Sequence, residues 1–419
     1  MNFATNYFVR YTALPPFLAD MPDGDLDIAV IIPCYDDPFV VRTLDSLESA
    51  SPADSKIEVI VNVNSGENTP PEIVERNRRI FDELKRRADT GFYRNFKLLP
   101  ITVEGTARKK AGVGYARKTA MDEAVRHFAA IDRPDGLIVS LDADTLVSEH
   151  YFEEIRRASA DSDDKCFTFQ FRHDFDAAKY GTEVVEACRL YEMYLRYYRL
   201  ALKTTGAPFA IHTIGSCFAV RAETYVKLGG MNTRQGGEDF YFLQKAVKMH
   251  PVHEVAARIV FPSPRVSNRV PFGTGPSVGN IIEKGRYTVY NFGLFALLKS
   301  FYGLFPDMER ADLRDSVPGE IIDYTGGREF DAAVAECRRY SSSSKAFIKR
   351  MYDRFDAFFT VKFLNTFNNS DRYPPMEVTA AAAMLLDCCG MDASADLYDG
   401  LVSADLGTAC YAPPSLRST

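Results

Sequence analysis

Apolar and polar positions alternate in blocks along the first 150 residues. Short runs rich in Val, Ile and Leu, the type of run that predicts buried strands, occur at 27–33, 56–64, 96–103 and 137–145. Between them, apolar residues recur at helical spacing in 38–50, 72–87 and 111–130. Strands that alternate with helices favour an α/β fold built on a doubly wound, mostly parallel sheet with helices on both faces.

The pattern changes in the last third of the chain, where helical periodicity dominates and strand signals are few. We therefore expect three parts: an N-terminal arm at 1–26, an α/β domain at 27–280 and a helical C-terminal extension at 281–419. One expected helix, around Tyr191, Tyr194, Tyr197 and Tyr198, carries its rings at a spacing that buries an aromatic face.

Charge and composition exclude several classes of protein. The formal net charge of −7 and a pI near 5.6 argue against a nucleic-acid-binding protein, which needs clustered Lys and Arg. Eight cysteines, from Cys34 to Cys410, show no zinc-binding spacing and indicate reduced thiols in a cytoplasm. We expect no secretory signal, and the longest uncharged apolar run, 287–298, is too short to span a bilayer.

Two carboxylates, Asp142 and Asp144, follow the apolar run that begins at residue 137. Positions two apart on a strand point to the same side, so we expect the two charges to lie close together at the edge of the sheet. Such a pair suits a Mg²⁺ or Mn²⁺ ion that bridges protein to a diphosphate. An N-cap aspartate followed by a turn aspartate would give the same sequence. A phosphatase motif of the form DxDx[TV] is disfavoured because its fifth position is Leu146.

Two further segments carry candidate chemistry. Basic residues surround the glycines at 112 and 114, where a helix should begin, so this turn predicts an anion site unless it is only a solvated basic face. The turn lacks the third glycine of a dinucleotide-binding fingerprint. Glu238 and Asp239 follow a glycine-rich loop at the start of another expected helix, where one carboxylate is a candidate general base and the other a helix cap.

Taken together, these segments resemble the family 2 glycosyltransferases of the GT-A fold. VIIPCYDDP, NVNSGENT, GVGYARKTAMDEA, SLDADTLV, IGSCFAVRAETYVKLGGM and GGEDFYF occur in the family's order, over roughly residues 27–270. The resemblance implies a nucleotide-diphosphate-sugar donor, a divalent cation at the DxD-type motif, and an inverting displacement with one carboxylate as base. The missing third glycine after residue 114 argues separately against a dinucleotide-dependent oxidoreductase.

The resemblance also implies roles for particular residues. Asp239, with Glu238 beside it, matches the catalytic base, and Asp142 and Asp144 match the ribose and metal pair. The remaining matches lie on the donor side and are expected to contact the nucleotide or its phosphates: Pro33, Tyr35, Asp36, Asn64, Ser65 and Arg117. Asn64 and Ser65 stand where the family often has an aspartate that reads the base.

Beyond the expected base lies a proline-bounded loop with Arg265 and Arg269. Guanidinium groups match phosphate oxygens, so this loop is a candidate to close over a diphosphate or an anionic acceptor, and surface arginines on a linking loop are the alternative. His253 is a candidate further metal ligand, although a single histidine is more often structural.

The resemblance implies a glycosyltransferase that moves a hexosyl group from a UDP-sugar, or a GDP-sugar, to a glycan or lipid-linked acceptor in cell-surface glycan or glycoconjugate synthesis. We expect Mn²⁺ or Mg²⁺ as cofactor and a cytoplasmic protein that meets the inner face of the membrane only transiently. A sugar nucleotidyltransferase and a catalytically inactive sugar-nucleotide-binding protein are the alternatives.

Overall fold

The computed structural model describes residues 2–12, 14–19, 21–160, 164–270, 272–391 and 396–407. The chain divides into two compact units, which are treated separately below. Unit 1 comprises residues 1–181 and 212–276, and unit 2 comprises residues 182–211 and 277–419. The boundaries 27–280 and 281–419 expected from the sequence stay a prediction.

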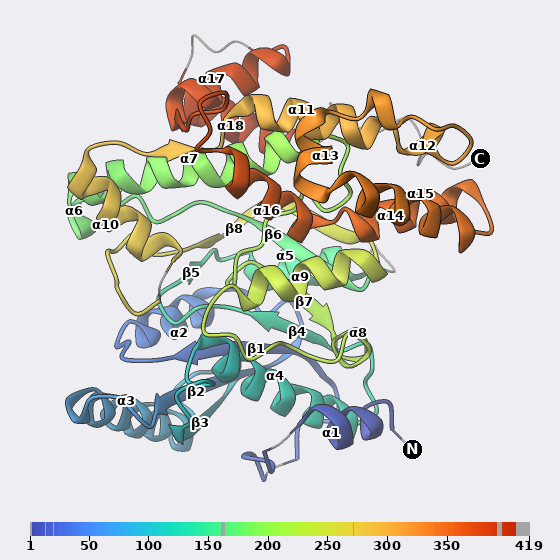
Figure 1. Cartoon of the computed structure of the whole chain (residues 1–419). Coiled ribbons are helices and arrows are strands. Elements are labelled where there is room, and N and C mark those ends of the chain that lie inside the picture. Colours follow the sequence, from blue (N-terminus) through green and yellow to red (C-terminus); the bar gives the residue numbers. More distant parts are fainter. Residues whose placement is uncertain are drawn as a thin grey trace. The chain divides into compact units, whose positions relative to one another are not determined.

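Unit 1 is built on one sheet in the strand order β3-β2-β1-β4-β7-β6-β8-β5 (Figure 1). The pairs β3–β2, β2–β1, β1–β4 and β6–β8 are parallel, whereas β4–β7, β7–β6 and β8–β5 are antiparallel. The strands are β1 (Leu26–Cys34), β2 (Lys56–Gly66), β3 (Lys97–Thr106), β4 (Leu137–Ser140), β5 (Leu146–Val147), β6 (Cys166–Phe171), β7 (Phe218–Arg221) and β8 (Val252–Phe261). The predicted α/β class with a mostly parallel sheet is confirmed.

Helices cover this sheet on both faces. Successive residues of β1 and β2 point to opposite faces, yet nearly all are buried, so neither face of these strands meets solvent. The α4 helix packs on β1 and β2, α3 on β2 and β3, and α5 on β8. The helices of unit 1 are α1 (Thr5–Tyr11), α2 (Val40–Ser49), α3 (Pro71–Asp89), α4 (Val113–Ala130), α5 (Tyr151–Ala160), α6 (Ala177–Tyr180), α8 (Ala222–Lys227) and α9 (Glu238–Met249); α10 (Thr274–Lys284) begins in it.

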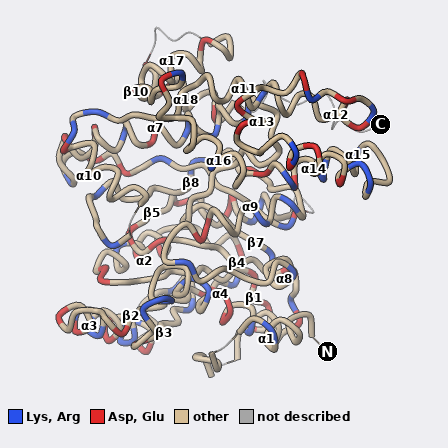
Figure 2. The backbone as a smooth tube through the Cα atoms, viewed as in Figure 1, with Lys and Arg blue, Asp and Glu red and all other residues tan. Residues whose placement is uncertain are grey.

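The helix expected at 72–87 is α3, a charged surface helix on which Lys and Arg alternate with Asp and Glu (Figure 2). Glu83 accepts hydrogen bonds from both Arg86 and Arg87, at 2.7 Å each from Oε1. These exposed pairs add only tenths of a kcal/mol each. The buried residues of this helix are therefore the informative ones, and one of them is Asn77.

The N-terminal arm folds against α4 rather than trailing away from the domain. Tyr7 of α1 is 2 % exposed, and its hydroxyl donates a 2.6 Å hydrogen bond to Asp122 Oδ1 on α4. Further along the arm, the backbone N–H groups of Phe17 and Leu18 both donate to Glu123 Oε2 at 3.1 Å. Two acidic residues of α4 thus hold the arm in place.

Unit 2 is almost wholly helical, as the periodicity predicts. It contains α7 (Thr182–Thr204), α11 (Phe292–Gly303), α12 (Phe305–Met308), η1 (Arg314–Ser316), α13 (Gly319–Thr325), α14 (Gly327–Arg339), α15 (Ser344–Arg354), α16 (Ala357–Phe367), α17 (Val378–Cys388) and α18 (Leu397–Leu406), with a short β9 (Thr288–Val289) and β10 (Met376–Glu377) pair. Tyr191 and Tyr197 of α7 are buried, which confirms the aromatic face expected there.

Most of the long apolar run at 287–298 lies in α11. Leu294, Phe295, Leu298 and Phe301 of this helix are buried, whereas Phe292 and Leu297 are half-buried. Across the described residues, we find no helix with the length and apolar content needed to cross a bilayer. Seven cysteines lie in the described residues, whereas Cys410 lies outside them.

Candidate active site

The candidate site lies in unit 1, at the carboxyl ends of β1, β2 and β4, where ligands bind in sheets of this type. One expectation is wrong in detail. Strand β4 ends at Ser140, so Asp142 and Asp144 lie in the turn before β5 and do not share a strand face. The turn allows each carboxylate to reach a different arginine.

Arg117 is the centre of the first cluster, and its side chain is 2 % exposed. Its Nη2 donates to Asp142 Oδ1 at 2.8 Å and its Nε to Glu238 Oε1 at 3.0 Å. Its Nη1 donates to Ser140 Oγ at 2.5 Å and to the Gly215 carbonyl at 3.2 Å. Burial works against the charged form, but the carboxylates of Asp142 and Glu238 raise the pKa of the guanidinium above its ordinary value. Arg117 therefore fixes the positions of two carboxylates.

Glycines let the backbone approach this cluster closely. A Cβ atom added at Gly215 would lie 2.7 Å from Arg117 Nη2, and one at Gly114 would lie 2.4 Å from the carbonyl oxygen of Arg234. The N–H of Gly114 also donates to that Arg234 oxygen at 3.2 Å. The start of α4 is thus covered by the loop that leads to Glu238.

The loop that covers the start of α4 bears on the anion site that the sequence predicts there. The basic residues Arg108, Lys109 and Lys110 are exposed, whereas Arg117 is buried in the cluster described above. Lys118 donates to Asp122 Oδ2 at 2.8 Å, on the side of α4 that holds the arm. The structure therefore does not bring these five basic side chains together.

Asp239 lies beside Glu238 in the first turn of α9, and it is only partly buried, whereas Glu238 is 2 % exposed. The N–H of Phe240 donates to Asp239 Oδ1 at 2.7 Å. Burial and the neighbouring Glu238 raise the pKa of Asp239 from 3.8 to about 7, against the opposing effect of Arg117. A carboxyl group with this pKa can take up a proton at neutral pH.

A second cluster joins the turn after β4 to the proline-bounded loop. Arg265 Nη2 donates to Asp144 Oδ2 at 2.8 Å and also to Asp37. Arg269 Nη1 donates to Asp37 Oδ2 at 2.5 Å and to the Tyr35 carbonyl at 3.2 Å. Sequence reasoning missed Asp37, although it directly follows Asp36 at the end of β1.

The carboxylates of both clusters were tested as ligands for a divalent cation. Among the described residues, no three His, Cys, Asp or Glu side chains group closely enough to form a complete metal centre. For Asp142 and Asp144, however, the recorded hydrogen bonds use only one oxygen of each carboxylate, Oδ1 and Oδ2 respectively. The other two oxygens are hard ligands of the kind that Mg²⁺ and Mn²⁺ prefer, with donor phosphates completing the shell, so the residues fit the cation.

His253 is not part of this arrangement. It lies at the start of β8. Phe261, at the other end of that strand, pairs with Leu146, which follows the turn of Asp142, Ala143 and Asp144, here called the DAD turn. The His253 Nδ1 atom lies 3.3 Å from Asp164 Oδ2. The structure thus separates His253 from Asp144 by the length of a strand.

The residues expected to contact the nucleotide lie around the ends of β1 and β2. Pro33 is buried in β1 and pairs in register with Asn62, whereas Tyr35 and Asp36 are partly exposed beyond the strand. Asn64 and Ser65 are 7 % and 2 % exposed, so their side chains face the protein interior. The structure brings these segments together, but Asn64 and Ser65 are buried below the surface at this edge of the sheet.

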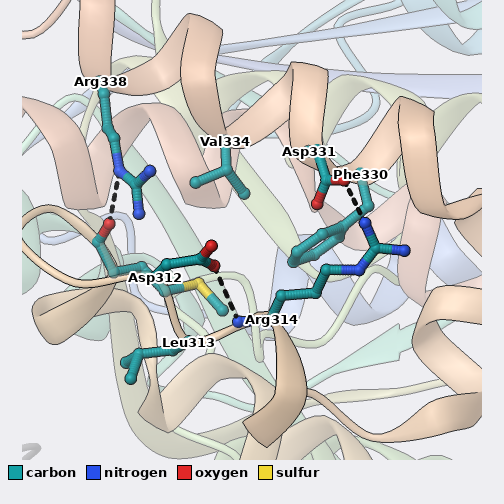
Figure 3. Close-up of a pocket in the computed structure, with 8 residues that line it drawn as sticks. Asp312, Leu313, Arg314, Phe330, Asp331, Val334 and Arg338 are labelled. Atoms are coloured by element: carbon teal, nitrogen blue, oxygen red, sulfur yellow. Dashed lines mark hydrogen bonds and ion pairs between the residues drawn. The ribbon is translucent and has the colours of Figure 1, made fainter.

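Two hollows elsewhere were examined as alternative sites. One, of about 100 Å³, lies in unit 2 beside α14, and Arg314 and Asp331 form an ion pair at it (Figure 3). The other, of about 190 Å³, lies at the amino ends of β1 and β4, opposite the candidate site. Both are smaller than the roughly 300 Å³ or more typical of small-molecule sites.

Comparisons with known proteins bear on these residues directly. The family profile described as Glycosyl transferase family group 2 matches residues 137–294. No curated protein matches the chain significantly.

Several solved structures resemble the chain distantly. They include S. aureus TarS 1-349 in complex with UDP-GlcNAc, with 11 % identity, a TM-score of 0.39, and 91 % of this chain and 90 % of that chain covered. A second is the mannosyltransferase PcManGT from Pyrobaculum calidifontis in complex with GDP-Man and Mn²⁺, with 16 % identity, a TM-score of 0.36, and 96 % and 93 % covered. A third is GalNAc-T7 with UDP, GalNAc and Mn²⁺, with 13 % identity, a TM-score of 0.37, and 80 % and 59 % covered.

The profile match includes both carboxylate motifs of the site, the DAD turn with Asp142 and Asp144 and the start of α9 with Glu238 and Asp239. These motifs lie in a mixed α/β unit whose strand ends converge on them. Residues 137–294 thus resemble the glycosyltransferase family group 2, and both carboxylate motifs lie within the matched segment.

Proposed function

We propose that the chain is a metal-dependent, inverting glycosyltransferase that transfers a hexosyl group from a nucleotide-diphosphate sugar to an acceptor hydroxyl. The observation that carries this proposal is the position of Asp239. A carboxyl group with a pKa of about 7 lies next to the Arg117 cluster, which also holds Asp142 of the DAD turn. Arg117 thus binds Glu238, the neighbour of the base, and Asp142 of the DAD turn.

In this mechanism Asp239 accepts the proton of the acceptor hydroxyl while the oxygen attacks the anomeric carbon from the face opposite the leaving group. Glu238 is buried and paired with Arg117, so it positions the start of α9 and is not the base. Arg117 itself is too buried to contact a diphosphate and holds the carboxylates in place. When bound at Asp142 and Asp144, the divalent cation neutralises charge on the diphosphate.

The loop arginines are assigned to the donor. Arg265 and Arg269 lie beside Asp144, and guanidinium groups form paired hydrogen bonds with phosphate oxygens. We propose that they exchange carboxylate partners for the diphosphate when the donor binds. UDP-sugars are the favoured donors, with GDP-sugars next, and the acceptor is a glycan or lipid-linked sugar in cell-surface glycan synthesis at the cytoplasmic side of a membrane.

The test is a thermal-shift panel of UDP-, GDP- and dTDP-sugars with and without Mn²⁺. A ligand that binds only the folded protein raises its melting temperature, and binding at a hundred times Kd adds about 2.7 kcal/mol. We expect one nucleotide class to raise the melting temperature, and Mn²⁺ to enlarge the shift. The Asp144→Asn variant should fold normally and lose most of the additional rise in melting temperature that Mn²⁺ produces with the wild type.

Product analysis then separates the possible reactions. Release of UDP or GDP with transfer of the sugar supports a glycosyltransferase, whereas release of pyrophosphate would identify a nucleotidyltransferase. Binding without turnover over a broad acceptor panel would point to a sugar-nucleotide-binding protein. Full metal dependence in a well-folded Asp144→Asn protein would remove Asp144 from the metal site.

A further inference from the structure

We propose that Asn77 is a positioning residue that sets the shape of the nucleotide-binding edge and thereby the affinity for the donor nucleotide. Asn77 lies on α3, outside every motif that suggested function. The proposal rests on the proposed function, because it requires that a nucleotide binds at the ends of β1 and β2.

The side chain of Asn77 links the two strand ends directly. Its Oδ1 accepts a 2.8 Å hydrogen bond from the backbone N–H of Asp36, just beyond β1. Its Nδ2 donates to the Asn64 carbonyl at 3.0 Å and to Ser65 Oγ at 2.9 Å, both at the end of β2. Asn77 is 3 % exposed, so water cannot easily replace these bonds.

Asp36 shows why such a link is needed. Its φ angle is +50°, in the left-handed region that few residues other than glycine, asparagine and aspartate adopt. Two consecutive residues of α3 hold it there. Asn77 binds its N–H, and Arg76 binds both carboxylate oxygens, through Nε at 2.7 Å and Nη2 at 2.8 Å.

An amide group is the side chain that meets these requirements. The site needs one acceptor for Asp36 and two donor hydrogens for Asn64 and Ser65, which matches an asparagine. An aspartate would keep the acceptor and lose both donors, and it would place a buried negative charge against two oxygen atoms. A leucine would leave all three backbone and hydroxyl groups without their partner.

The effect should fall on nucleotide binding and not on the chemical step. Among the described residues, the hydrogen bonds recorded for Asn77 go only to Asp36, Asn64 and Ser65. Asp239 and Arg117 belong to a different set of contacts, centred on α4 and α9. A loosened nucleotide edge would therefore raise the KM for the donor while kcat at saturating donor changes little.

The experiment compares Asn77→Ala and Asn77→Asp with a matched control, Asn95→Ala. The Asn95 amide also holds a turn, donating to the carbonyls of Glu48 at 2.7 Å and Ala50 at 3.2 Å, but it precedes the amino end of β3, away from the site. Binding of UDP and of GDP is measured by calorimetry, and KM for the donor and kcat are measured separately. We expect both Asn77 variants to weaken nucleotide binding about tenfold or more and to raise KM similarly, with kcat within about threefold of wild type.

Each outcome decides the matter. A loss of nucleotide affinity in Asn77→Ala no greater than in Asn95→Ala overturns the proposal, as does a loss that falls on kcat with KM unchanged. If Asn77→Ala fails to fold, Ser65→Ala, which removes one of the three partners, must weaken nucleotide binding more than Asn95→Ala does. If the wild-type protein binds none of the nucleotides tested, the proposed function fails instead, and the two failures are distinguishable.

Discussion

At the residue scale, the pairing of Asp239 with Glu238 alters the chemistry of the site. Glu238 is held as a carboxylate partner of Arg117, so a second negative charge one residue away is unfavourable. Burial is the larger cause, and together with Glu238 it raises the pKa of Asp239 to about 7. Protonated and deprotonated Asp239 therefore coexist near neutral pH, and a base must be deprotonated to act.

This pKa predicts a pH dependence of the reaction. As the pH rises from 5 to 8, the fraction of Asp239 in the carboxylate form increases, so kcat/KM should rise about tenfold per pH unit below 7 and level off near 8. The measurement is a pH profile of initial rates with wild-type protein. A profile that is flat between pH 5 and 8 would show that Asp239 does not act as the base.

The Asp239→Asn variant is the control for that profile. In this variant kcat should be about a hundredfold or more lower, and nucleotide binding should be nearly intact. The rise of kcat/KM with pH below 7 should disappear. Because the folded-state pKa lies above the ordinary value, the folded state favours protonated Asp239, and wild type loses stability as the pH rises from about 4 through 7. The variant should therefore be more stable than wild type at pH 8, by about 1–2 kcal/mol, since partial exposure reduces the upper bound of ~4 kcal/mol. Loss of activity in Glu238→Gln but not in Asp239→Asn would reverse the assignment.

The sequence predicted which residues gather at the site better than it predicted their contacts. Asp142, Glu238 and Arg117 were all singled out, yet Arg117 was expected near phosphates and instead binds the other two side chains. Its partner Glu238 lies 121 positions away along the chain, a distance over which local periodicity carries no information. Asn77 and Asp37 were missed for a related reason, because their roles depend only on what they face after folding.

At the element scale, regular segments followed their hydrophobic patterns closely. The run at 56–64 became β2, and the serine run at 341–344 supplied the cap of α15, where Ser343 Oγ accepts from the N–H of Ala346 at 3.2 Å. The run at 137–145 predicted a longer strand than the structure contains, since β4 ends at Ser140. In the sequence, Asp142 and Asp144 appear to extend the buried strand. In the structure they lie in a turn, where Asp142 pairs with Arg117 and Asp144 with Arg265.

The arm that packs on α4 gives a prediction at this scale. Tyr7→Phe removes the 2.6 Å hydrogen bond to Asp122 Oδ1 and leaves that buried carboxylate to Lys118, Tyr225 and Thr12. We expect the free energy of unfolding to fall by about 1–3 kcal/mol, as for a buried bond to a charged group, measured by urea denaturation. Tyr11→Phe is the matched control, because Tyr11 belongs to the same helix and is 52 % exposed. Equal stability of the two variants would mean that the arm does not contribute through Tyr7.

At the scale of the whole molecule, charge and surface composition bear on how the enzyme meets its acceptor. The net charge of −7 disfavours approach to anionic lipid, and α11, the most apolar helix of unit 2, buries Leu294, Phe295, Leu298 and Phe301 and leaves Phe292 and Leu297 half-buried. Its exposed positions are Ala296, Lys299, Ser300 and Gly303, which offer little apolar area to a bilayer. A helix that lies on a membrane instead exposes a broad apolar face bordered by basic residues.

We therefore predict that the purified protein does not bind anionic vesicles stably at physiological salt. In liposome flotation, the chain should remain in the dense fraction with vesicles of phosphatidylcholine and phosphatidylserine, and equally with vesicles of phosphatidylcholine alone. Stable recovery with both kinds of vesicle would reveal an apolar contact with the bilayer, whereas recovery with the anionic vesicles alone, lost at high salt, would reveal an electrostatic one. Either recovery would contradict the prediction.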